Sequence, residues 1–323
     1  MDPKKLRIVF MGTPELAAHC LDSLCREGYH IAGVVTAADK PAGRGRKIRQ
    51  SAVKQTALDR GLPLLQPLNL KSPEFIEALK DLKPQLQVVV AFRMLPESVW
   101  ELPPLGTFNM HASLLPQYRG AAPINHVIIN GETETGVTTF LLDRRIDTGR
   151  ILFREAIPVD EDETAGSLHE KIKPAAAAII RRTIDALATG EATAVDQEQF
   201  MLPGEPLKPA PKIHREDCLI DWQRPGREVV RRIRGLSPQP GAWCEAPLRP
   251  GSIQPMKILS ARFEPGPTGY PAGTLLTDNR EVLAFATPDG RVRVEGLQVP
   301  GKKPMPADAF LRGFRFGNPL LTG

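Results

Sequence analysis

The sequence predicts an α/β protein in which a doubly wound, mostly parallel sheet is followed by a small β-barrel. Strand-like and helix-like patterns alternate over the first 190 residues, as they do when helices connect parallel strands. The polar, proline-rich stretch 190–213 then discourages regular structure. Beyond it, short strand-like runs separated by glycine and proline turns are typical of a small barrel.

The chain opens with the strand and helix that begin such a sheet. The apolar run 6–11 predicts the first strand. Thr13 is suited to cap the following helix and Pro14 fits its first turn, so we expect a helix over 14–27 that stops at Gly28.

The other strands and helices of the first domain are predicted from the same strand-like and helix-like patterns of apolar residues. Ligands bind beyond the carboxyl ends of the strands in such sheets, so Gly12, 109–111 and the loop 143–149 are expected to converge on one crevice. The first turn has a single glycine and no G-x-G-x-x-G, which disfavours a nicotinamide dehydrogenase. We expect further strands at 30–36, 86–92, 107–111 and 137–142, and helices at 51–60, 72–82, 122–130 and 164–187.

The C-terminal region is expected to be the barrel. The helix 226–234 carries four arginines, and a solvated face is the commoner role for such a helix than a binding surface. We divide the chain into a domain at 1–189, a linker at 190–213 and a second domain at 214–323. Strands of the second domain are expected at 219–222, 242–245, 257–263, 282–287 and 292–294.

Composition excludes several classes of protein. Hydrophobic residues make up 41% and charged residues 24% of 323 residues, which is ordinary for a soluble protein of two domains. No apolar run approaches the roughly 20 residues of a membrane helix, and the first strand begins too early for a signal peptide. The four cysteines have no C-x-x-C spacing and the six histidines form no helical pair. We therefore expect a cytoplasmic protein with reduced thiols and no metal.

Positive charge is concentrated in two places. Residues 1–190 contain 24 Lys and Arg against 22 Asp and Glu, whereas residues 206–323 contain 18 against 11. Within the first domain, the segment 39–49 holds five cations, two glycines and a proline with no apolar period, so we expect a mobile loop. Five cations that repel one another favour a phosphate partner, although a solvated loop is the alternative. The cations are Lys40, Arg44, Arg46, Lys47 and Arg49.

A catalytic constellation is suggested by Asn109, His111 and Asp147. Asn109 and His111 are two residues apart on an extended segment, so they face the same side. An amide and an imidazole stabilise a developing oxyanion, and a carboxylate orients the imidazole or moves a proton. Taken alone, His111 is also compatible with a hydrogen-bonded core residue, and Asp143 or Asp147 could simply pair with the arginines between them.

An ordered set of motifs resembles a known family. The motifs are Gly12-Thr13-Pro14, the segment 40–49, Asn109-x-His111-x-Ser113-Leu114-Leu115-Pro116, Tyr118-Arg119-Gly120-Ala121-Ala122-Pro123-Ile124, Asp147-Thr148-Gly149, Ile220-Asp221-Trp222 and Gly301-Lys302-Lys303. Together they resemble the methionyl-tRNA formyltransferase family over nearly the whole chain. One departure is Ala91-Phe92-Arg93-Met94-Leu95-Pro96, where the family commonly has an aromatic-glycine-leucine run before Ile-Leu-Pro.

The resemblance implies a fold and an activity. It implies a Rossmann-type formyltransferase domain and an OB-fold-like tRNA-binding domain. It also implies transfer of a formyl group from 10-formyltetrahydrofolate to initiator Met-tRNA, which supports translation initiation. We expect the protein to be a monomer. It places catalysis on Asn109, His111 and Asp147. It places folate contacts on Ser113, Leu114, Leu115 and Pro116, and tRNA contacts on Lys40, Arg44, Arg46, Lys47 and Arg49.

Two kinds of rival function remain: formyl transfer to a different amine, and nucleic-acid binding without any formyl transfer. Glycinamide ribonucleotide and sugar-nucleotide formyltransferases share the amide, imidazole and carboxylate, but the basic segment 39–49 and the basic second domain favour tRNA. A nucleic-acid-binding protein with an inactive first domain would explain the charge without needing Asn109, His111 and Asp147 together.

Overall fold

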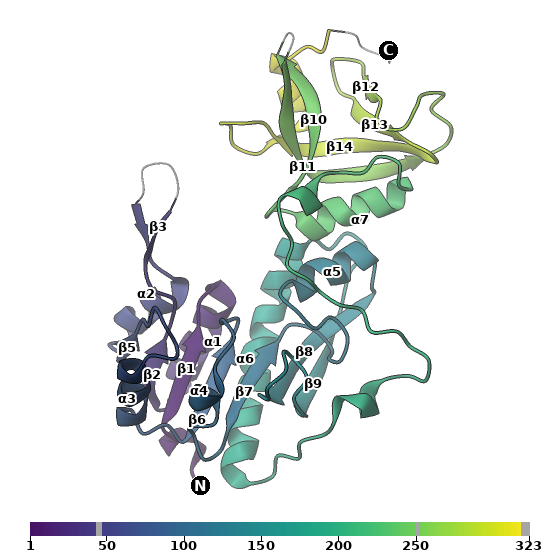
Figure 1. Cartoon of the computed structure of the whole chain (residues 1–323). Helices are drawn as coiled ribbons and strands as arrows, with labels where there is room; N and C mark the ends of the chain where they lie inside the picture. Colours follow the sequence, from purple (N-terminus) through teal and green to yellow (C-terminus); the bar gives the residue numbers. More distant parts are fainter. Residues whose placement is uncertain (43–46, 250–251, 318–323) are drawn as a thin grey trace. The chain divides into compact units, whose positions relative to one another are not determined.

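The computed structural model describes residues 1–42, 47–249 and 252–317, with side chains except at 40–42, 47–49 and 249 (Figure 1). The described chain divides into two compact units. The first contains 1–120, 134–158 and 169–209. The second contains 121–133, 159–168 and the described residues from 210 onward.

The first unit is built on a seven-stranded sheet in the order β5-β2-β1-β6-β7-β8-β9 (Figure 1). The strands from β5 to β7 pair in parallel, whereas β8 and β9 are antiparallel to their neighbours. The predicted doubly wound, mostly parallel sheet is therefore confirmed. Its strands are β1 (Ile8–Gly12), β2 (Ile31–Val35), β5 (Leu64–Leu65), β6 (Leu86–Val90), β7 (Thr107–His111), β8 (Glu134–Leu141) and β9 (Ile151–Pro158).

The predicted helices are present, although one predicted cap is wrong. Pro14, and not Thr13, is the N-cap residue of the first helix, and no side chain caps it. By contrast, the Ser51 and Ser72 hydroxyls cap the next two helices by accepting backbone N–H groups. The helices are α1 (Glu15–Arg26), α2 (Ala52–Asp59), α3 (Pro73–Asp81), α4 (Glu97–Trp100), α5 (Pro123–Asn130) and α6 (Ala165–Thr189), and short 3₁₀ helices lie at Pro3–Lys5 (η1) and Gln197–Phe200 (η2).

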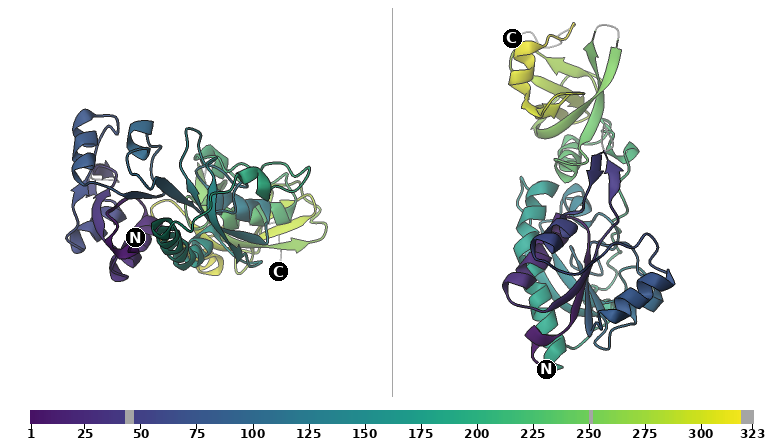
Figure 2. Two further views of the ribbon diagram at one scale, coloured as in Figure 1. Left: turned by 90° about the horizontal axis from the view of Figure 1, so that it is seen from below. Right: turned by 90° about the vertical axis from the view of Figure 1, so that its left-hand side faces the viewer.

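Both faces of this sheet are covered, as expected for apolar strands without alternation. On one face, Val9 and Met11 pack in a core cluster with Phe75 of α3 and Val99 of α4. Helix α6 runs along the opposite face (Figure 2). A buried hydrogen bond of 2.8 Å between the hydroxyls of Thr139 on β8 and Thr183 on α6 joins that helix to the sheet.

The segment 39–49 was expected to be a loop, and the structure corrects this. Strands β3 (Lys40–Ala42) and β4 (Lys47–Arg49) form a two-stranded antiparallel sheet, which pairs Lys40 with Arg49. Periodicity could not predict these strands, because backbone pairing in a hairpin does not require an apolar face. Residues 43–46, between the two strands, lie outside the described residues.

The second unit has a curled antiparallel sheet in the order β10-β11-β14-β13-β12, with β15 beside β14 (Figure 1). Register shifts on both sides of Ser260 bend β11 against β14, as a bulge does. The predicted β domain after the parallel sheet is therefore confirmed. Its elements are η3 (Glu216–Cys218), α7 (Gly226–Leu236), β10 (Ala242–Arg249), β11 (Ser252–Pro265), β12 (Leu275–Thr277), β13 (Leu283–Thr287), β14 (Gly290–Gln298), β15 (Met305–Pro306) and α8 (Ala307–Gly313).

The predicted strand 219–222 is wrong. Leu219 forms only an isolated bridge with Trp243, and the chain then turns because the Asp221 carboxylate accepts the backbone N–H of Gln223. The strands β5, β9, β12 and β15 and the helices α4 and α8 were not predicted. All four cysteines are free thiols, as expected. Within the part of the chain that the structure describes, no helix combines the length and hydropathy needed to span a membrane.

Candidate functional site

Strand β7 ends at the candidate site and carries its first two residues. Asn109 and His111 lie on the same side of the strand, opposite Phe140 and Thr138 of β8. Asn109 is half-buried, and among the described residues its side-chain amide has no hydrogen-bond partner. The amide is therefore free to donate to a bound molecule.

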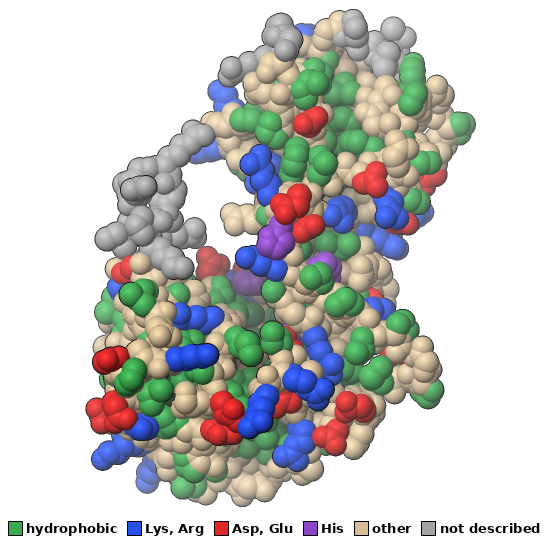
Figure 3. Space-filling view, in the orientation of Figure 1, with side chains coloured by type: hydrophobic (Ala, Val, Ile, Leu, Met, Phe, Trp, Pro, Cys, Tyr) green, Lys and Arg blue, Asp and Glu red, His purple; other side chains and the backbone are tan. Residues whose placement is uncertain are grey.

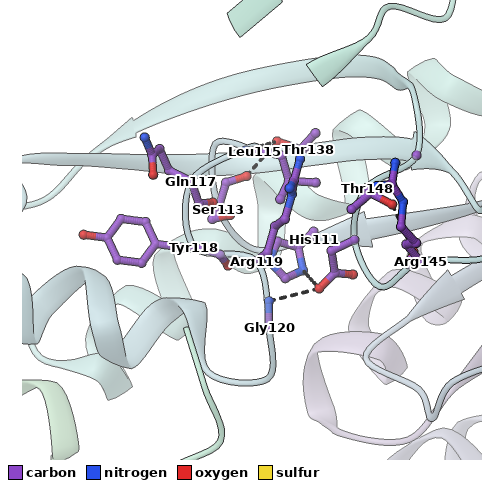
Figure 4. A network of polar contacts seen from close by, with 12 residues as sticks. His111, Ser113, Leu115, Gln117, Tyr118, Arg119, Gly120, Thr138, Arg145 and Thr148 are labelled. Atoms are coloured by element: carbon purple, nitrogen blue, oxygen red, sulfur yellow. Dashed lines mark hydrogen bonds and ion pairs between the residues drawn. The ribbon is translucent and has the colours of Figure 1, made fainter. Parts of the chain in front are cut away.

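The imidazole of His111 is held in one orientation. It is 7% exposed, and Nε2 lies 2.8 Å from the backbone oxygen of Tyr118. A carbonyl oxygen only accepts, so Nε2 carries a proton and donates it. Nδ1 is then the nitrogen left for chemistry, and it lies 3.9 Å from Oδ2 of Asp147 (Figure 4).

Asp147 is fixed by contacts to its side chain and its backbone. Oδ2 accepts the backbone N–H of Gly120 at 3.0 Å (Figure 4). The residue has φ 55°, a left-handed conformation that is uncommon for a residue other than glycine. Its backbone oxygen accepts Nε2–H of Gln197 at 2.9 Å, and the same amide nitrogen donates to the Gly149 oxygen at 2.8 Å.

The structure distinguishes the two acids that flank the arginine pair. The Asp143 carboxylate accepts the backbone N–H of Arg145 at 2.9 Å and the Thr148 hydroxyl, so it closes its own loop. Arg144 pairs with Glu97 at 2.7 Å. Of the two acids, Asp147 faces His111, and among the described residues neither carboxylate pairs with an arginine side chain, which contradicts the alternative of a simple aspartate–arginine pair.

Glycine is required directly after this loop. A Cβ atom at Gly149 would lie 1.7 Å from the backbone oxygen of Leu141 at the end of β8. Only a residue without a side chain allows the loop to approach the strand this closely. This close approach explains why glycine is the last residue of the motif Asp147-Thr148-Gly149.

The segment Ser113–Pro116 follows β7 and is tied to β8 (Figure 4). The Thr138 hydroxyl donates to the Ser113 backbone oxygen at 2.7 Å and accepts the Leu115 N–H at 3.2 Å. Leu115 is fully buried in a cluster with Phe140, whereas Leu114 is half-buried. The leucines therefore differ: one belongs to the core, and the other borders the loop.

We expect Thr138→Val to destabilise this segment selectively. The two backbone groups that Thr138 serves would stay buried without partners, at a cost of about 1–3 kcal/mol in the free energy of unfolding. Thr135 on the same strand is a matched control, because its buried hydroxyl has no partner among the described residues. Thr135→Val should be neutral or stabilising by up to about 1 kcal/mol. Urea titration of both variants measures the difference, and equal effects would contradict the assignment.

Comparison with known proteins decides the family. A family model described as formyl transferase matches residues 6–184, and one described as the formyl transferase C-terminal domain matches 212–315. The chain is 50% identical over 314 residues to methionyl-tRNA formyltransferase of Bacteroides fragilis, covering 97% of each protein. It is 46% identical over 315 residues to that of Flavobacterium johnsoniae, covering 98% of each. The chain belongs to the methionyl-tRNA formyltransferase family.

Solved structures of other proteins have the same fold as this chain, although their sequence identity to it is low. HypX of Aquifex aeolicus, solved with tetrahydrofolic acid, has a TM-score of 0.63 and 18% identity, over 95% of this chain and 47% of HypX. WlaRD, a sugar 3N-formyl transferase, has a TM-score of 0.62 and 19% identity, over 92% of this chain and 99% of WlaRD. At this identity the likeness concerns the fold.

Arg93, where the chain departs from the formyltransferase family pattern, has a structural role. The guanidinium donates from Nη1 to the Leu68 backbone oxygen at 2.9 Å and from Nη2 to the Pro67 oxygen. It also lies 5.6 Å from the centroid of the Phe92 ring. Arg93 therefore fastens the turn after β6 to the segment 67–68.

The base of the β3–β4 hairpin is described, whereas the predicted tRNA-contacting side chains are not. Asp39 accepts Nζ–H of Lys54 at 2.6 Å and Nε2–H of Gln66 at 3.0 Å. The hydrogen bond from Lys54 holds the pKa of the Asp39 carboxyl below its usual value. The side chains of Lys40, Arg44, Arg46, Lys47 and Arg49 lie outside the described residues.

Two of the four arginines of α7 are not simply solvated. Arg232 donates to the Asp217 backbone oxygen, and Arg234 donates to the backbone oxygens of Glu161 and Glu163. These contacts hold α7 to its own unit. On the face of the first unit shown in Figure 3, Lys and Arg side chains are interspersed with Asp and Glu.

Sequence reasoning missed Gln197 altogether and gave Arg119 no role. Arg119 Nε and Nη2 donate to Oε1 of Gln197 at 3.1 and 2.7 Å. Gln197 lies in the proline-rich stretch, where no motif marks it. No group of three histidine, cysteine or acidic side chains suited to a metal occurs among the described residues.

Proposed function

We propose that this protein transfers the formyl group of 10-formyltetrahydrofolate to the methionine amine of initiator Met-tRNA, with Asn109, His111 and Asp147 as the catalytic residues. The observation that carries the proposal is the free Nδ1 of His111 directed at Asp147, beside an unpartnered Asn109 amide on the same strand, among the described residues. The similarity to proteins named methionyl-tRNA formyltransferase over nearly the whole chain supports the choice of substrate.

The chemistry needs an oxyanion site more than a strong base. The pKa of an α-amino group is ordinarily about 8, so much of it is already neutral at pH 7. Its nitrogen attacks the formyl carbon and forms a tetrahedral oxyanion, to which the Asn109 amide donates a hydrogen bond. The bond from carbon to N10 of the folate then breaks, N10 takes a proton, and the former amine gives one up.

His111 acts through Nδ1 because Nε2 is committed to Tyr118. As an imidazolium it donates Nδ1–H to the oxyanion or to the leaving nitrogen, and the Asp147 carboxylate at 3.9 Å stabilises that cation. Oδ1 of Asp147 has no partner among the described residues, so it is available to accept the amine proton through water.

The folate donor is assigned to the segment Ser113–Pro116. Leu115 is buried in the core, so its contact with folate would come from its backbone, whereas Leu114 would supply an apolar edge. HypX, which shares the fold, was solved with tetrahydrofolic acid, and this agrees with a folate donor. The proposed reaction uses no metal.

The polyanionic acceptor is assigned to the basic segment 40–49 and to the second domain, 214–323. Lys40, Arg44, Arg46, Lys47 and Arg49 are proposed to contact phosphates of the tRNA. With the linker assigned to 190–213, these domains would act as a cytoplasmic monomer in translation initiation.

Replacing Arg44, Arg46 and Lys47 with Ala should weaken the use of tRNA far more than that of folate. Loss of three phosphate contacts should raise the KM for Met-tRNA roughly tenfold or more and flatten its dependence on salt. The KM for the folate should stay within about twofold. A triple variant of the exposed cations Lys71, Lys80 and Lys83 is the control. If the salt dependence of the KM for Met-tRNA were unchanged in the variant of Arg44, Arg46 and Lys47, these cations would be a solvated surface and not a tRNA contact.

The deciding experiment offers 10-formyltetrahydrofolate with one of three amines: initiator Met-tRNA, elongator Met-tRNA or glycinamide ribonucleotide. We expect formylation of initiator Met-tRNA. Because solved sugar and glycinamide ribonucleotide formyltransferases share this fold, formylation of the small amine alone would replace the proposed substrate.

A further inference from the structure

We infer that Gln197 is a positioning residue that sets the spacing between Asp147 and His111. The inference rests on the proposed function of that pair. Gln197 lies on η2, outside every motif of the family resemblance, and it is 2% exposed. A buried primary amide must satisfy both its donors and its acceptor, and Gln197 does so entirely within this site.

The hydrogen bonds of Gln197 join two loops. Its Nε2 donates to the backbone oxygens of Asp147 and Gly149, and its Oε1 accepts both Nε–H and Nη2–H of Arg119. One side of the amide therefore holds the loop that carries the catalytic carboxylate. The other side holds the turn that follows β7.

That turn contains the partners of both catalytic side chains. Arg119 lies between Tyr118, whose oxygen binds Nε2 of His111, and Gly120, whose N–H binds Oδ2 of Asp147. Any shift of Arg119 relative to the loop 147–149 would change the separation of the imidazole and the carboxylate. Gln197 connects the two through Arg119, in addition to the direct hydrogen bond from the Gly120 N–H to the Asp147 carboxylate.

Backbone conformation indicates that this geometry needs support. Asp147 has φ 55° and Tyr118 has φ 62°, so non-glycine residues adopt the left-handed region on both sides of the Gln197 amide. Such conformations are energetically unfavourable for residues with a side chain and persist where surrounding contacts enforce them. The contacts of Gln197 to the Asp147 oxygen and to the neighbour of Tyr118 meet this requirement.

The segment that bears Gln197 is itself fixed to the sheet. Val195 and Ile151 exchange two backbone hydrogen bonds of 2.8 Å, which places η2 beside the start of β9. The Arg154 guanidinium stacks over the Phe200 ring at 4.6 Å from its centroid. Because anchors lie on both sides of Gln197, its amide is held rigidly relative to the sheet.

The test combines Gln197→Met with Asp147→Asn. Methionine keeps the length of the side chain but donates nothing, so Gln197→Met should lower kcat about 10- to 100-fold while the KM values stay within about threefold. If Gln197 acts through Asp147, adding Gln197→Met to Asp147→Asn should cost less than about threefold further. Equal losses in both backgrounds would overturn the inference, since a merely structural role is independent of Asp147.

A second readout does not depend on activity. Hydrogen–deuterium exchange of the backbone amides in 143–150 should speed up in Gln197→Met, and Gln199→Met is the control because Gln199 is exposed on the same short helix. Unchanged exchange would also overturn the inference. The two proposals remain separable. Wild-type protein that fails to formylate Met-tRNA contradicts the proposed function. An active wild-type protein whose kcat and amide exchange are unchanged by Gln197→Met contradicts only the inference about Gln197.

Discussion

His111→Ala is expected to reduce kcat for Met-tRNA formylation by roughly 10²–10⁴-fold, the range for loss of a positioned acid–base group. The variant removes the ring nitrogen that faces Asp147. The oxyanion then keeps only the Asn109 amide as a donor, and the leaving nitrogen loses its proton donor. The KM for tRNA should change less than about threefold, because Nδ1 is proposed to act in the transition state. Single-turnover formylation with radiolabelled donor measures the loss.

The matched control for this variant is His30→Ala. His30 is exposed, and the structure gives its ring no described partner, so activity should match that of the wild type. A parallel fall of kcat and tRNA binding in His111→Ala would instead mean that His111 holds the core through Tyr118 and takes no part in the reaction.

Asn109→Ala is expected to lower kcat by about 10²–10³-fold, the usual cost of removing one donor from an oxyanion site. Because the Asn109 amide has no partner among the described residues, the substitution leaves no protein group unpaired, and thermal stability should change little. The separation of a large kinetic effect from a small stability effect is the signature of a group that works on substrate.

Asn109→Asp sharpens the comparison. The carboxylate has nearly the same size but carries negative charge and cannot donate when ionised, so it should be at least as damaging as alanine. Activity of Asn109→Asp near the wild-type value would show that the oxyanion lies elsewhere. Folate binding, followed by fluorescence quenching, monitors the integrity of the neighbouring segment 113–116 in both variants.

The elements that the sequence predicted best are those with a strong local period. Strand β7 occupies 107–111 as expected, because its apolar residues and its end at His111 are both local features. The predicted loop was wrong at 40–42 and 47–49, and the predicted strand at 219–222 was wrong, for the opposite reason. The first pairs backbones without an apolar face, and the second is turned aside by the Asp221 carboxylate.

At the candidate site, too, some features follow from the local sequence and others only from the structure. Spacing alone placed Asn109 and His111 on one side of a strand, and the resemblance chose Asp147 over Asp143. Only the structure supplies a physical reason for that choice, since Asp143 binds its own loop while Asp147 faces the imidazole. Motifs could not indicate Gln197, because its partners are 48 to 78 residues away in the chain.

Local sequence was sufficient to predict the order of most strands and helices, the identity of the proposed reacting side chains and the family to which the chain belongs. These properties depend on periods of 2.0 and 3.6 residues and on short motifs. Folding selects which nitrogen of His111 is free, which aspartate faces it, and which glutamine joins their loops. Those properties depend on hydrogen bonds between distant segments, and such bonds exist only after the sheet has brought the segments together.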